Sequence, residues 1–338
     1  MWISSAPLRV SLAGGGTDVP SYADRFGGVV LGTTIDLRVT VVGRPARTHG
    51  HIRACLDSCS STAAGDVANP FAREALRRHW GGNPLELASF ADVPGGTGLG
   101  SSSAFTVALV AGLTAGQLDP AAAAKAASVI ETEGLGRPVG RQDQYLSALG
   151  GFHLLHFSHR GVVEAEKVPV DEEFVRRLDD ELLLFFTGRT RDSGEVLGEQ
   201  NARVGQSDRA AERRLHEIKA LTWPALDALK NNDTTALGKV LGRHWDLKRQ
   251  LGAQVSLPSV DRAYADAIRA GASGGKLLGA GGGGFLLLHA KAGVQEEVRA
   301  AVTTHGLTEQ PFHFDGRGVH VAAVDPAGPP REPVPTAT

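Results

Sequence analysis

The stretch Asp92-Val-Pro-Gly-Gly-Thr-Gly-Leu-Gly-Ser-Ser-Ser-Ala104 places four glycines and three serines directly ahead of an apolar run, Phe105 to Leu113. Glycine lets a backbone adopt left-handed conformations and approach a ligand closely. Serine is a favoured N-cap, and the run behind it has helical length and composition. A glycine loop that ends at a helix N-terminus presents N–H groups to an anion. The stretch therefore predicts a cradle for nucleotide phosphates; the alternative is a glycine-rich turn before a buried helix.

The composition of the whole chain is that of a globular protein. Its 338 residues are enough for two domains, and its formal net charge is −2. No basic block indicates a nucleic-acid partner, and no apolar run approaches the ~20 residues of a membrane span. The N-terminus does not resemble a secretion signal, and the only cysteines, Cys55 and Cys59, are expected to be reduced thiols. We therefore expect a cytoplasmic protein with neither a nucleic-acid nor a membrane partner.

Many of the 43 glycines fall in three clusters, at residues 14–16, 95–100 and 279–284. Each cluster adjoins an apolar run of strand or helix type, so we interpret the clusters as loops that converge on one ligand. Strand patterns dominate the first half of the chain and long helical patterns the second. This change predicts a first domain at 1–170, a second at 171–325, and a disordered proline-rich tail at 326–338.

Local patterns predict several individual elements. Asp119 to Glu133 reads as a helix with Asp119 as its N-cap, and a later helical pattern is expected to break at Pro224. Phe312 to Val324 reads as a closing hairpin that turns at Asp315-Gly316.

Two further motifs accompany the opening stretch in a fixed order. Pro94-Gly-Gly-Thr-Gly-Leu-Gly-Ser-Ser-Ser-Ala104 resembles the phosphate loop of the GHMP kinases, Pro-x-x-x-Gly-Leu-Gly-Ser-Ser-Ala, and lacks the Walker and Rossmann patterns. Ala6-Pro-Leu-Arg-Val-Ser-Leu-Ala-Gly-Gly-Gly-Thr-Asp18 resembles the first motif of that family. Lys276-Leu-Leu-Gly-Ala-Gly-Gly-Gly-Gly-Phe285 resembles its third. The resemblance implies the α+β, two-domain GHMP kinase fold, with a ferredoxin-like second domain and the active site in the cleft between domains.

The first motif narrows the resemblance within the family. Gly14-Gly-Gly-Thr-Asp18 lacks the glutamate and histidine of the galactokinase sequence Gly-Glu-His-Thr-Asp. Together with Gly140-Arg-Gln-Asp-Gln-Tyr145 and Phe312-His-Phe-Asp315, it is similar to the D-glycero-D-manno-heptose 7-phosphate kinase branch. That branch transfers the γ-phosphoryl of ATP to the anomeric (C1) hydroxyl of a heptose 7-phosphate and forms the 1,7-bisphosphate.

Three alternatives remain open on the sequence. One is another sugar 1-kinase, of the fucose or galactose type, and a second is a non-catalytic sugar- and ATP-binding sensor on the same scaffold. A hydride-transferring dehydrogenase is a more distant third, because the chain lacks a dinucleotide-binding glycine motif. The sequence is compatible with a homodimer, and no motif in it specifies an oligomeric state.

The resemblance also implies which residues hold ATP and Mg²⁺. Ser102 and Glu131 align with the magnesium ligands of the family, with Glu133 as a competitor for the carboxylate. Mg²⁺ prefers oxygen ligands and needs only one or two protein groups beside phosphate oxygens. A helix cap and a solvated acid are the respective structural alternatives. The ATP phosphates are expected on Pro94, Gly95, Gly96, Gly98, Leu99, Gly100, Ser101, Ser102 and Ser103.

Asp143 occupies the place of the catalytic aspartate of the family, and Arg9 that of the cation in its first motif. A carboxylate near the acceptor hydroxyl can orient it and take its proton as phosphoryl transfer proceeds. A guanidinium beside that carboxylate would keep it ionised. Without the resemblance, the two residues would read as a turn aspartate and a surface arginine.

The sugar phosphate requires hydroxyl-binding groups and a second anion site. Arg189 and Arg191 are candidates for the substrate phosphate because guanidinium binds phosphate in a bidentate manner, and Lys276 is a third candidate. A surface-exposed basic loop is the alternative for the two arginines. The remaining residues expected to bind substrate are Gly15, Gly16, Thr17, Asp18, Gln142, Gly281 and Gly282.

Overall fold

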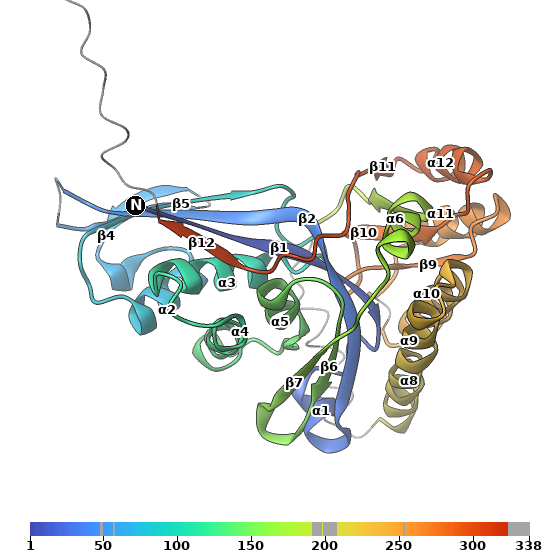
Figure 1. The fold of residues 1–338 in the computed structure, drawn as a ribbon, viewed down its shortest axis with the longest axis horizontal. Coiled ribbons are helices and arrows are strands. Elements are labelled where there is room, and N and C mark those ends of the chain that lie inside the picture. The colour runs from blue at the N-terminus through green and yellow to red at the C-terminus, as the bar shows by residue number, and fades with distance from the viewer. Residues whose placement is uncertain (48–49, 57, 191–197, 199–207, 253, 324–338) are drawn as a thin grey trace, which may run out of the picture.

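Two sheets organise the chain (Figure 1). The structure is a computed structural model that describes residues 1–338 except 48–49, 57, 191–197, 199–207, 253 and 324–338. Within the described residues, the first sheet has eight strands and the second has four. The change from one sheet to the other falls between the last strand of the first half, β7 (Val163–Lys167), and α6 (Glu172–Glu181).

The first sheet is built around two long antiparallel strands, β1 (Trp2–Ala13) and β2 (Gly28–Pro45). Valine, isoleucine and threonine make up much of β2, and such β-branched residues favour an extended backbone. Irregular register between Pro7 and Arg9 and between Ser11 and Ala13 interrupts the pairing of β1 with β2. Bulges of this kind re-aim side chains. The order is β12-β1-β2-β5-β3-β4; β6 pairs with the N-terminal part of β2, and β7 pairs with β6. The further bounds are β3 (Ile52–Cys55), β4 (Cys59–Thr62), β5 (Leu85–Ala91), β6 (His153–Phe157) and β12 (His320–Ala323).

Helices of the first half cover one face of this sheet (Figure 1). The central helix α3 (Ser101–Leu113) is apolar all round and almost wholly buried, because β1 and β2 contact one side of it and α2, α4 and α5 the other. The remaining elements of this half are α1 (Pro20–Phe26), a 3₁₀ turn at Ala64–Asp66, α2 (Pro70–His79), α4 (Pro120–Val129), a π-helical turn at Ile130–Gly134, α5 (Gln142–Leu149) and a 3₁₀ turn at His159–Gly161.

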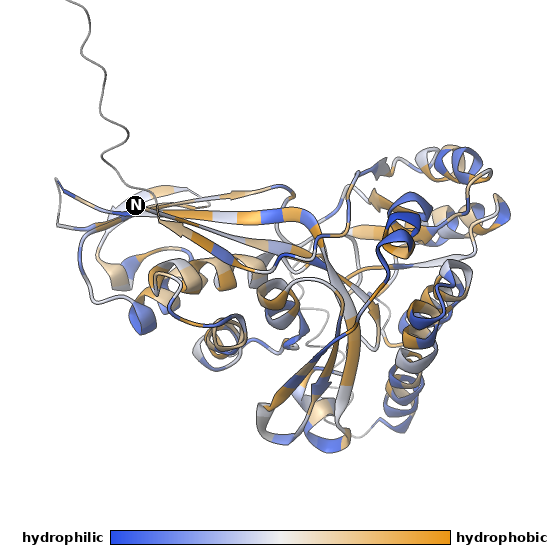
Figure 2. Cartoon of the chain, viewed as in Figure 1, coloured by the Kyte–Doolittle hydropathy of each residue, from blue (hydrophilic) through white to orange (hydrophobic). Residues whose placement is uncertain are grey.

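The second sheet has the antiparallel order β11-β8-β10-β9. Its central strands, β8 (Leu182–Phe186) and β10 (Phe285–His289), are leucine- and phenylalanine-rich and buried, whereas α6 is mostly hydrophilic in colour (Figure 2). Two helices, α9 and α10, also contact β1 of the first sheet, which brings the two halves together. The bounds are α8 (Arg209–Ala220), α9 (Thr222–Lys230), α10 (Thr234–Lys248), α11 (Pro258–Arg269), β9 (Gly274–Leu277), α12 (Gln295–Thr303) and β11 (Thr308–Glu309).

The expected closing hairpin over Phe312–Val324 is wrong. β11 pairs with β8 of the second sheet, whereas β12 pairs with the edge of β1, from Ser5 opposite His320 to Trp2 opposite Ala323. An isolated bridge between Ile35 and Phe314 marks the crossing from one sheet to the other. The exposed edge of β1 provides the backbone partners that a local hairpin would otherwise supply. The proposed second domain, 171–325, thus includes one strand of the first sheet, and the expected tail at 326–338 lies outside the described residues.

Two expected helix boundaries also differ. The break placed at Pro224 falls at Leu221, between α8 and α9, and Pro224 lies in the first turn of α9. Proline is tolerated there because first-turn N–H groups have no partner inside the helix. The helix expected to run from Asp119 to Glu133 ends at Val129 and continues as the π-helical turn.

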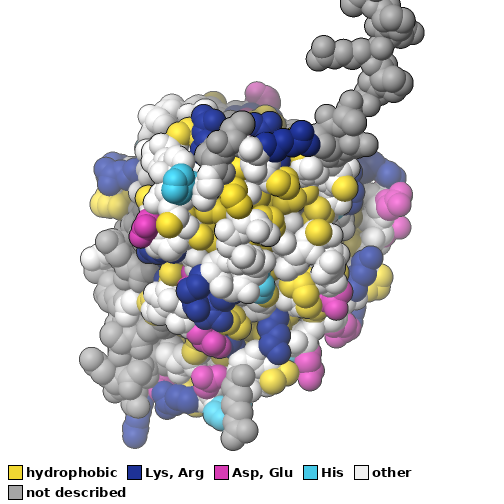
Figure 3. Space-filling model, turned by 90° about the vertical axis from the view of Figure 1, so that its left-hand side faces the viewer, with side chains coloured by type: hydrophobic (Ala, Val, Ile, Leu, Met, Phe, Trp, Pro, Cys, Tyr) yellow, Lys and Arg dark blue, Asp and Glu magenta, His cyan; other side chains and the backbone are white. Residues whose placement is uncertain are grey.

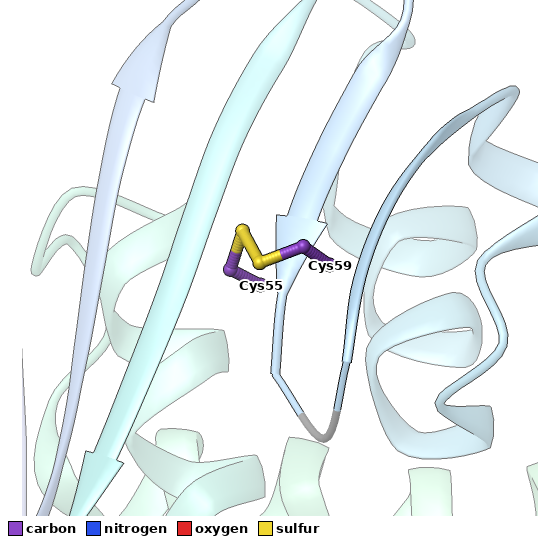
Figure 4. The surroundings of a disulfide bond; sticks show 2 residues. All are labelled: Cys55 and Cys59. Atoms are coloured by element: carbon purple, nitrogen blue, oxygen red, sulfur yellow. A yellow bond between two sulfur atoms is a disulfide. The ribbon is translucent and has the colours of Figure 1, made fainter.

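Cys55 and Cys59 form a disulfide rather than the expected pair of free thiols (Figure 4). They lie directly opposite each other in the antiparallel pair β3–β4. The separation of four residues is therefore the span of a hairpin, which brings the two side chains together on neighbouring strands. The sequence spacing alone did not show that a hairpin lies between them.

One face of the molecule carries side chains of both charges. On the face shown in Figure 3, basic, acidic and apolar side chains are interspersed. No helix among the described residues is long and apolar enough to cross a membrane.

Candidate active site

The opening stretch forms a loop that leads into the N-terminus of α3. Gly96, Gly98 and Gly100 have φ values of 72°, 82° and 78°, a region that favours glycine. Gly100 is the N-cap, and no side chain among the described residues caps the helix. The first N–H groups of α3 are therefore available to an anion. Gly96, Gly98, Gly100 and the three serines 101–103 line a cleft.

Three residues of the predicted phosphate loop do not line this cleft. Leu99 is fully buried in the core, and its carbonyl accepts a hydrogen bond from the backbone N–H of Arg9 at 3.0 Å. Pro94 and Gly95 lie on the surface. Their place in the motif shapes the loop: the carbonyl of Pro94 accepts a hydrogen bond from the Thr97 hydroxyl at 3.0 Å.

All three glycine clusters contribute to this cleft, as the sequence predicts. A Cβ atom on Gly279 would lie 2.4 Å from the Cα of Gly98, so only glycine allows the two loops to pack together. The backbone N–H of Phe285 donates to the carbonyl of Thr97 at 3.1 Å. The third cluster is thus held directly against the phosphate loop.

Arg9 and Asp143 form a bidentate ion pair beside the loop. The Nε and Nη2 atoms of Arg9 donate to Oδ1 and Oδ2 of Asp143 at 2.7 and 2.8 Å, and Nη1 donates to the carbonyl of Gly98 at 2.6 Å. Arg9 is 4% exposed, whereas Asp143 is 24% exposed, so the carboxylate is the partner that reaches a ligand. Asp143 lies in the first turn of α5, a helix that the sequence analysis did not predict. A Cβ on Gly100 would lie 3.3 Å from Asp143 Oδ2, which shows how closely the loop approaches this pair.

Asp18 is buried in the wall next to this ion pair. Its Oδ1 accepts from the N–H of Gly16 at 3.1 Å and from Nε2 of Gln142 at 2.9 Å, and its Oδ2 accepts from the N–H of Gln142 at 3.2 Å. Burial, followed by the charge of Asp143, raises the pKa of Asp18 above its usual range. Asp18, Gln142, Gly15 and Gly16 all line the cleft.

Thr17 does not fit its expected role as a substrate-binding residue. Its hydroxyl is fully buried and donates to the carbonyls of Gly14 and Val29 at 2.8 and 3.1 Å. The same oxygen accepts from the N–H of Val29 at 3.1 Å. These bonds tie the first glycine loop to β2, so the residue shapes the loop instead of facing the cleft.

Glu131 is a buried carboxylate in the π-helical turn after α4. Its Oε1 accepts from the Ser103 hydroxyl and from Gln144 Nε2, both at 2.7 Å, and no described residue hydrogen bonds to Oε2. Burial raises the pKa of Glu131 to about 7. Ser102 and Glu131 both line the cleft, but Glu133 does not. The donor set of hydroxyl and carboxylate oxygen fits a Mg²⁺ ion that is also bound by phosphate. The roles of Ser103 and Gln144 were missed by the sequence analysis.

The second half of the chain contributes two buried lysines to the cleft. Lys276 Nζ donates to the carbonyl of Ser11 at 2.9 Å and to Nδ1 of His244 at 3.0 Å. Lys248 Nζ donates to the carbonyl of Leu277 at 2.9 Å and to that of Gly279. Lys276 was a predicted substrate residue; Lys248 and His244 were missed. Their spacing of four residues on one helical pattern was the available signal, because it places both side chains on the same face.

The other predicted substrate residues are placed less favourably. Arg189 is exposed and does not line the cleft. Its backbone carbonyl contacts the third glycine cluster, where it accepts a hydrogen bond from the N–H of Gly284 at 2.9 Å. Arg191 lies outside the described residues. Gly281 lines the cleft, but Gly282 does not, and its N–H donates to the carbonyl of Val255 at 2.8 Å.

Two family models match the chain. The model of the GHMP kinases N terminal domain matches residues 67–151, and the model of the GHMP kinases C terminal matches residues 225–307. The D-glycero-alpha-D-manno-heptose 7-phosphate kinase of Campylobacter jejuni is 30% identical, over 94% of this chain and 97% of its own length. The bifunctional fucokinase/GDP-fucose pyrophosphorylase of Arabidopsis thaliana is 28% identical over 88% of this chain, which spans 31% of that protein.

Solved structures show the same architecture. The crystal structure of a D-glycero-D-manno-heptose 1-phosphate kinase from Bacteroides thetaiotaomicron matches with a TM-score of 0.78 and 26% identity, covering 96% of this chain and all of its own. These similarities confirm both the predicted family and the predicted α+β fold. With its phosphate loop, its Arg9–Asp143 pair and its third glycine cluster in one cleft, the chain belongs to the GHMP kinase family and is an ATP-dependent phosphotransferase that acts on an alcohol group.

Proposed function

We propose that this kinase transfers the γ-phosphoryl group of ATP to the anomeric hydroxyl of a heptose 7-phosphate, forming the 1,7-bisphosphate. The observation that carries the proposal is the Arg9–Asp143 pair, held at the end of the phosphate loop by Arg9 Nη1 and the carbonyl of Gly98. The similarity to the heptose 7-phosphate kinase of Campylobacter jejuni supports the choice of sugar.

Asp143 is the residue we assign to the acceptor hydroxyl. As the bond forms between the anomeric oxygen and the γ-phosphorus, the bond from that phosphorus to the bridging oxygen of ADP breaks, and the hydroxyl proton passes to the Asp143 carboxylate. In a loose phosphoryl-transfer transition state, orientation of the hydroxyl matters more than its early deprotonation. The two hydrogen bonds from Arg9 fix the carboxylate in one orientation. The exposed part of the Asp143 carboxylate then faces the cleft, where the substrate hydroxyl would bind.

Ser102 and Glu131 are the residues we assign to Mg²⁺. The free Oε2 of Glu131 and the Ser102 hydroxyl offer the hard oxygen ligands that this ion prefers, with Ser103 and Gln144 orienting the carboxylate. When bound, the ion would neutralise charge on the ATP phosphates. Burial keeps the pKa of Glu131 near 7, and a neighbouring cation would favour its ionised form.

Asp18 and Gln142 are the residues we assign to the sugar hydroxyls. Asp18 is fixed by three hydrogen bonds from Gly16 and Gln142, and a Cβ on Gly140 would lie 1.8 Å from its Oδ2. Both residues are therefore preorganised in the wall beside Asp143.

A sugar 1-kinase of the fucose type is the second candidate, because the Arabidopsis fucokinase also matches most of this chain. ADP release from ATP, measured over a panel of heptose 7-phosphates, free heptoses, fucose and galactose, separates the two. We expect kcat/KM to be highest for a heptose 7-phosphate; a higher value for a free sugar would overturn the proposal. A chain that releases no ADP with any sugar would instead favour the sensor.

A further inference from the structure

We propose that Lys248 and Lys276, together with Ser11 and Gln142, form a phosphate subsite in the cleft that binds the phosphate ester of the substrate. This inference deepens the proposed function and rests on it, because a phosphorylated sugar is what would require such a site. It replaces Arg189 and Arg191 with residues that line the cleft.

The two lysines lack the partners that buried cations usually have. Lys276 is 2% exposed and Lys248 is 8% exposed, yet neither forms an ion pair with any carboxylate of the described residues. Their hydrogen-bond acceptors are backbone carbonyls and one imidazole nitrogen. Two buried ammonium groups without a counter-ion are unfavourable, since desolvation is not offset by an opposite charge. An anionic group of the ligand would provide that charge.

The position of the lysines follows from the packing of α10 against β9. His244 and Lys248 lie four residues apart on α10 and face β9, which carries Lys276. Burial and the two lysines lower the pKa of His244 well below its usual range, so the ring is neutral. Its Nδ1 accepts from Lys276 Nζ at 3.0 Å. His244 is thus a positioning residue that directs Lys276 toward Ser11.

The first half of the chain supplies two polar atoms of the cleft that lack partners among the described residues. Ser11 Oγ and Gln142 Oε1 are buried, and neither has a hydrogen-bond partner among the described residues. Both flank Gly15: a Cβ there would lie 2.7 Å from Ser11 Oγ and 3.6 Å from Gln142 Oε1. The Ser11 hydroxyl can donate to a phosphate oxygen, whereas the Gln142 oxygen can only accept. An acceptor beside two cations fits the hydroxyl next to a phosphate, so the site matches a sugar phosphate ester better than inorganic phosphate.

The charges that most affect the pKa values of the two lysines are cationic, although Asp18, Glu131 and Asp143 line the same cleft. Burial, followed by the charge of Arg9, lowers the pKa of Lys248 to about 7, and burial, Lys248 and Arg9 lower the pKa of Lys276 well below its usual range. A bound phosphate would reverse this tendency and restore the ammonium forms. Ligand binding should therefore take up protons near pH 7 to 8.

The test compares Lys248→Met, Lys276→Met and Ser11→Ala with a matched control, Lys219→Met. Lys219 also donates to two backbone carbonyls, those of Phe26 and Gly27 at 2.8 Å each, but it does not line the cleft. Ser11→Ala guards against misfolding, because the Ser11 hydroxyl has no hydrogen-bond partner to lose among the described residues. The substrates are a heptose 7-phosphate and the same heptose without its phosphate. Binding of ADP and of AMP-PNP is measured separately.

We expect the three cleft variants to raise KM for the heptose 7-phosphate by about 10- to 100-fold, as the loss of charge-assisted hydrogen bonds would. KM for the free heptose, and the affinities for ADP and AMP-PNP, should change by less than about threefold, and Lys219→Met should resemble the wild type. Selective weakening of AMP-PNP would mean that the lysines bind the phosphoryl group in transit, and would overturn the proposal. Equal KM values in the cleft and control variants would overturn it as well.

A failure of the proposed function can be told apart from a failure of the subsite. If the wild type does not phosphorylate heptose 7-phosphates, inorganic phosphate is used as a probe of the ADP-bound protein, whose phosphate loop is already occupied. Thermal stabilisation by phosphate, with proton uptake in calorimetry, that is lost in Lys276→Met but kept in Lys219→Met supports the subsite. Equal stabilisation in both variants overturns it.

Discussion

The cleft contains two cationic regions that treat charge in opposite ways. Arg9 is buried and bonded to both oxygens of Asp143, whereas Lys248 and Lys276 are buried and, within the part of the chain that the structure describes, bonded only to uncharged acceptors. The first region is complete without a ligand, since each charge has its partner. The second region has no anionic partner among the described residues. The difference indicates that the Arg9–Asp143 pair fixes the geometry for the reaction, whereas the lysines are arranged to bind an anionic ligand.

Disrupting the Arg9–Asp143 pair should have the largest effect on activity. Asp143→Asn removes the proton acceptor and one charge of the pair, so we expect kcat to fall by about 10³-fold, with ADP affinity within about threefold of wild type. ADP release and calorimetric binding of ADP measure the two quantities. Asp171→Asn, which alters the N-cap of α6 away from the cleft, is the control. Activity near the wild-type level in Asp143→Asn would remove the aspartate from the mechanism.

A third charged group, Glu131, tests whether the cleft is also arranged for a metal ion. Glu131→Gln keeps an acceptor for Ser103 and Gln144 but removes the negative charge. We expect kcat/KM to fall by about 10- to 100-fold and the Mg²⁺ concentration for half-maximal activity to rise. Glu133→Gln, outside the cleft, should change neither quantity. An unchanged Mg²⁺ dependence in Glu131→Gln would contradict the assignment.

The two buried lysines should also affect the pH dependence of the free energy of unfolding when no ligand is bound. Because burial lowers the pKa of Lys248 to about 7, the folded chain binds fewer protons than the unfolded chain between pH 7 and the ordinary lysine pKa of 10.5. This part of the free energy of unfolding therefore rises with pH across that window. The charge of Arg9 also lowers the pKa of Lys248 and so acts in the same direction.

Lys248→Met removes this contribution. We therefore expect the free energy of unfolding of the variant to exceed that of the wild type by the largest amount at pH 7. The advantage should shrink by about 1–3 kcal/mol on going to pH 10. Urea denaturation of both proteins, and of Lys219→Met, at the two pH values measures the difference. A pH-independent difference would show that Lys248 is not a desolvated cation.

The smallest effect is expected for a cation outside both regions. Arg189 is exposed and does not line the cleft, so Arg189→Ala should change KM for the sugar phosphate by less than about twofold. A tenfold rise in KM would return Arg189 to the substrate site and weaken the contrast between the two regions.

The sequence by itself determined the family and the main parts of the cleft. Glycine clusters and the serines before an apolar run are local signals, and a backbone loop follows from a few adjacent residues. For this reason the phosphate loop, the convergence of three glycine clusters and the positions of Arg9, Asp18 and Glu131 in one cleft were predictable from motifs that the family shares.

Only the tertiary structure decided which side chains face one another. Lys276 meets the carbonyl of Ser11, which is 265 residues away in the chain, and β12 leaves the second sheet to pair with β1. The Cys55–Cys59 disulfide depends on strand register, and the burial of the Thr17 hydroxyl depends on its contacts with Gly14 and Val29. Register and long-range contacts follow from how whole elements bury their apolar faces, and a local pattern does not specify that packing. The phosphate loop and Lys276 as a candidate were therefore recognisable in the sequence, whereas Lys248 and the contacts of Lys276 with Ser11 and His244 were not.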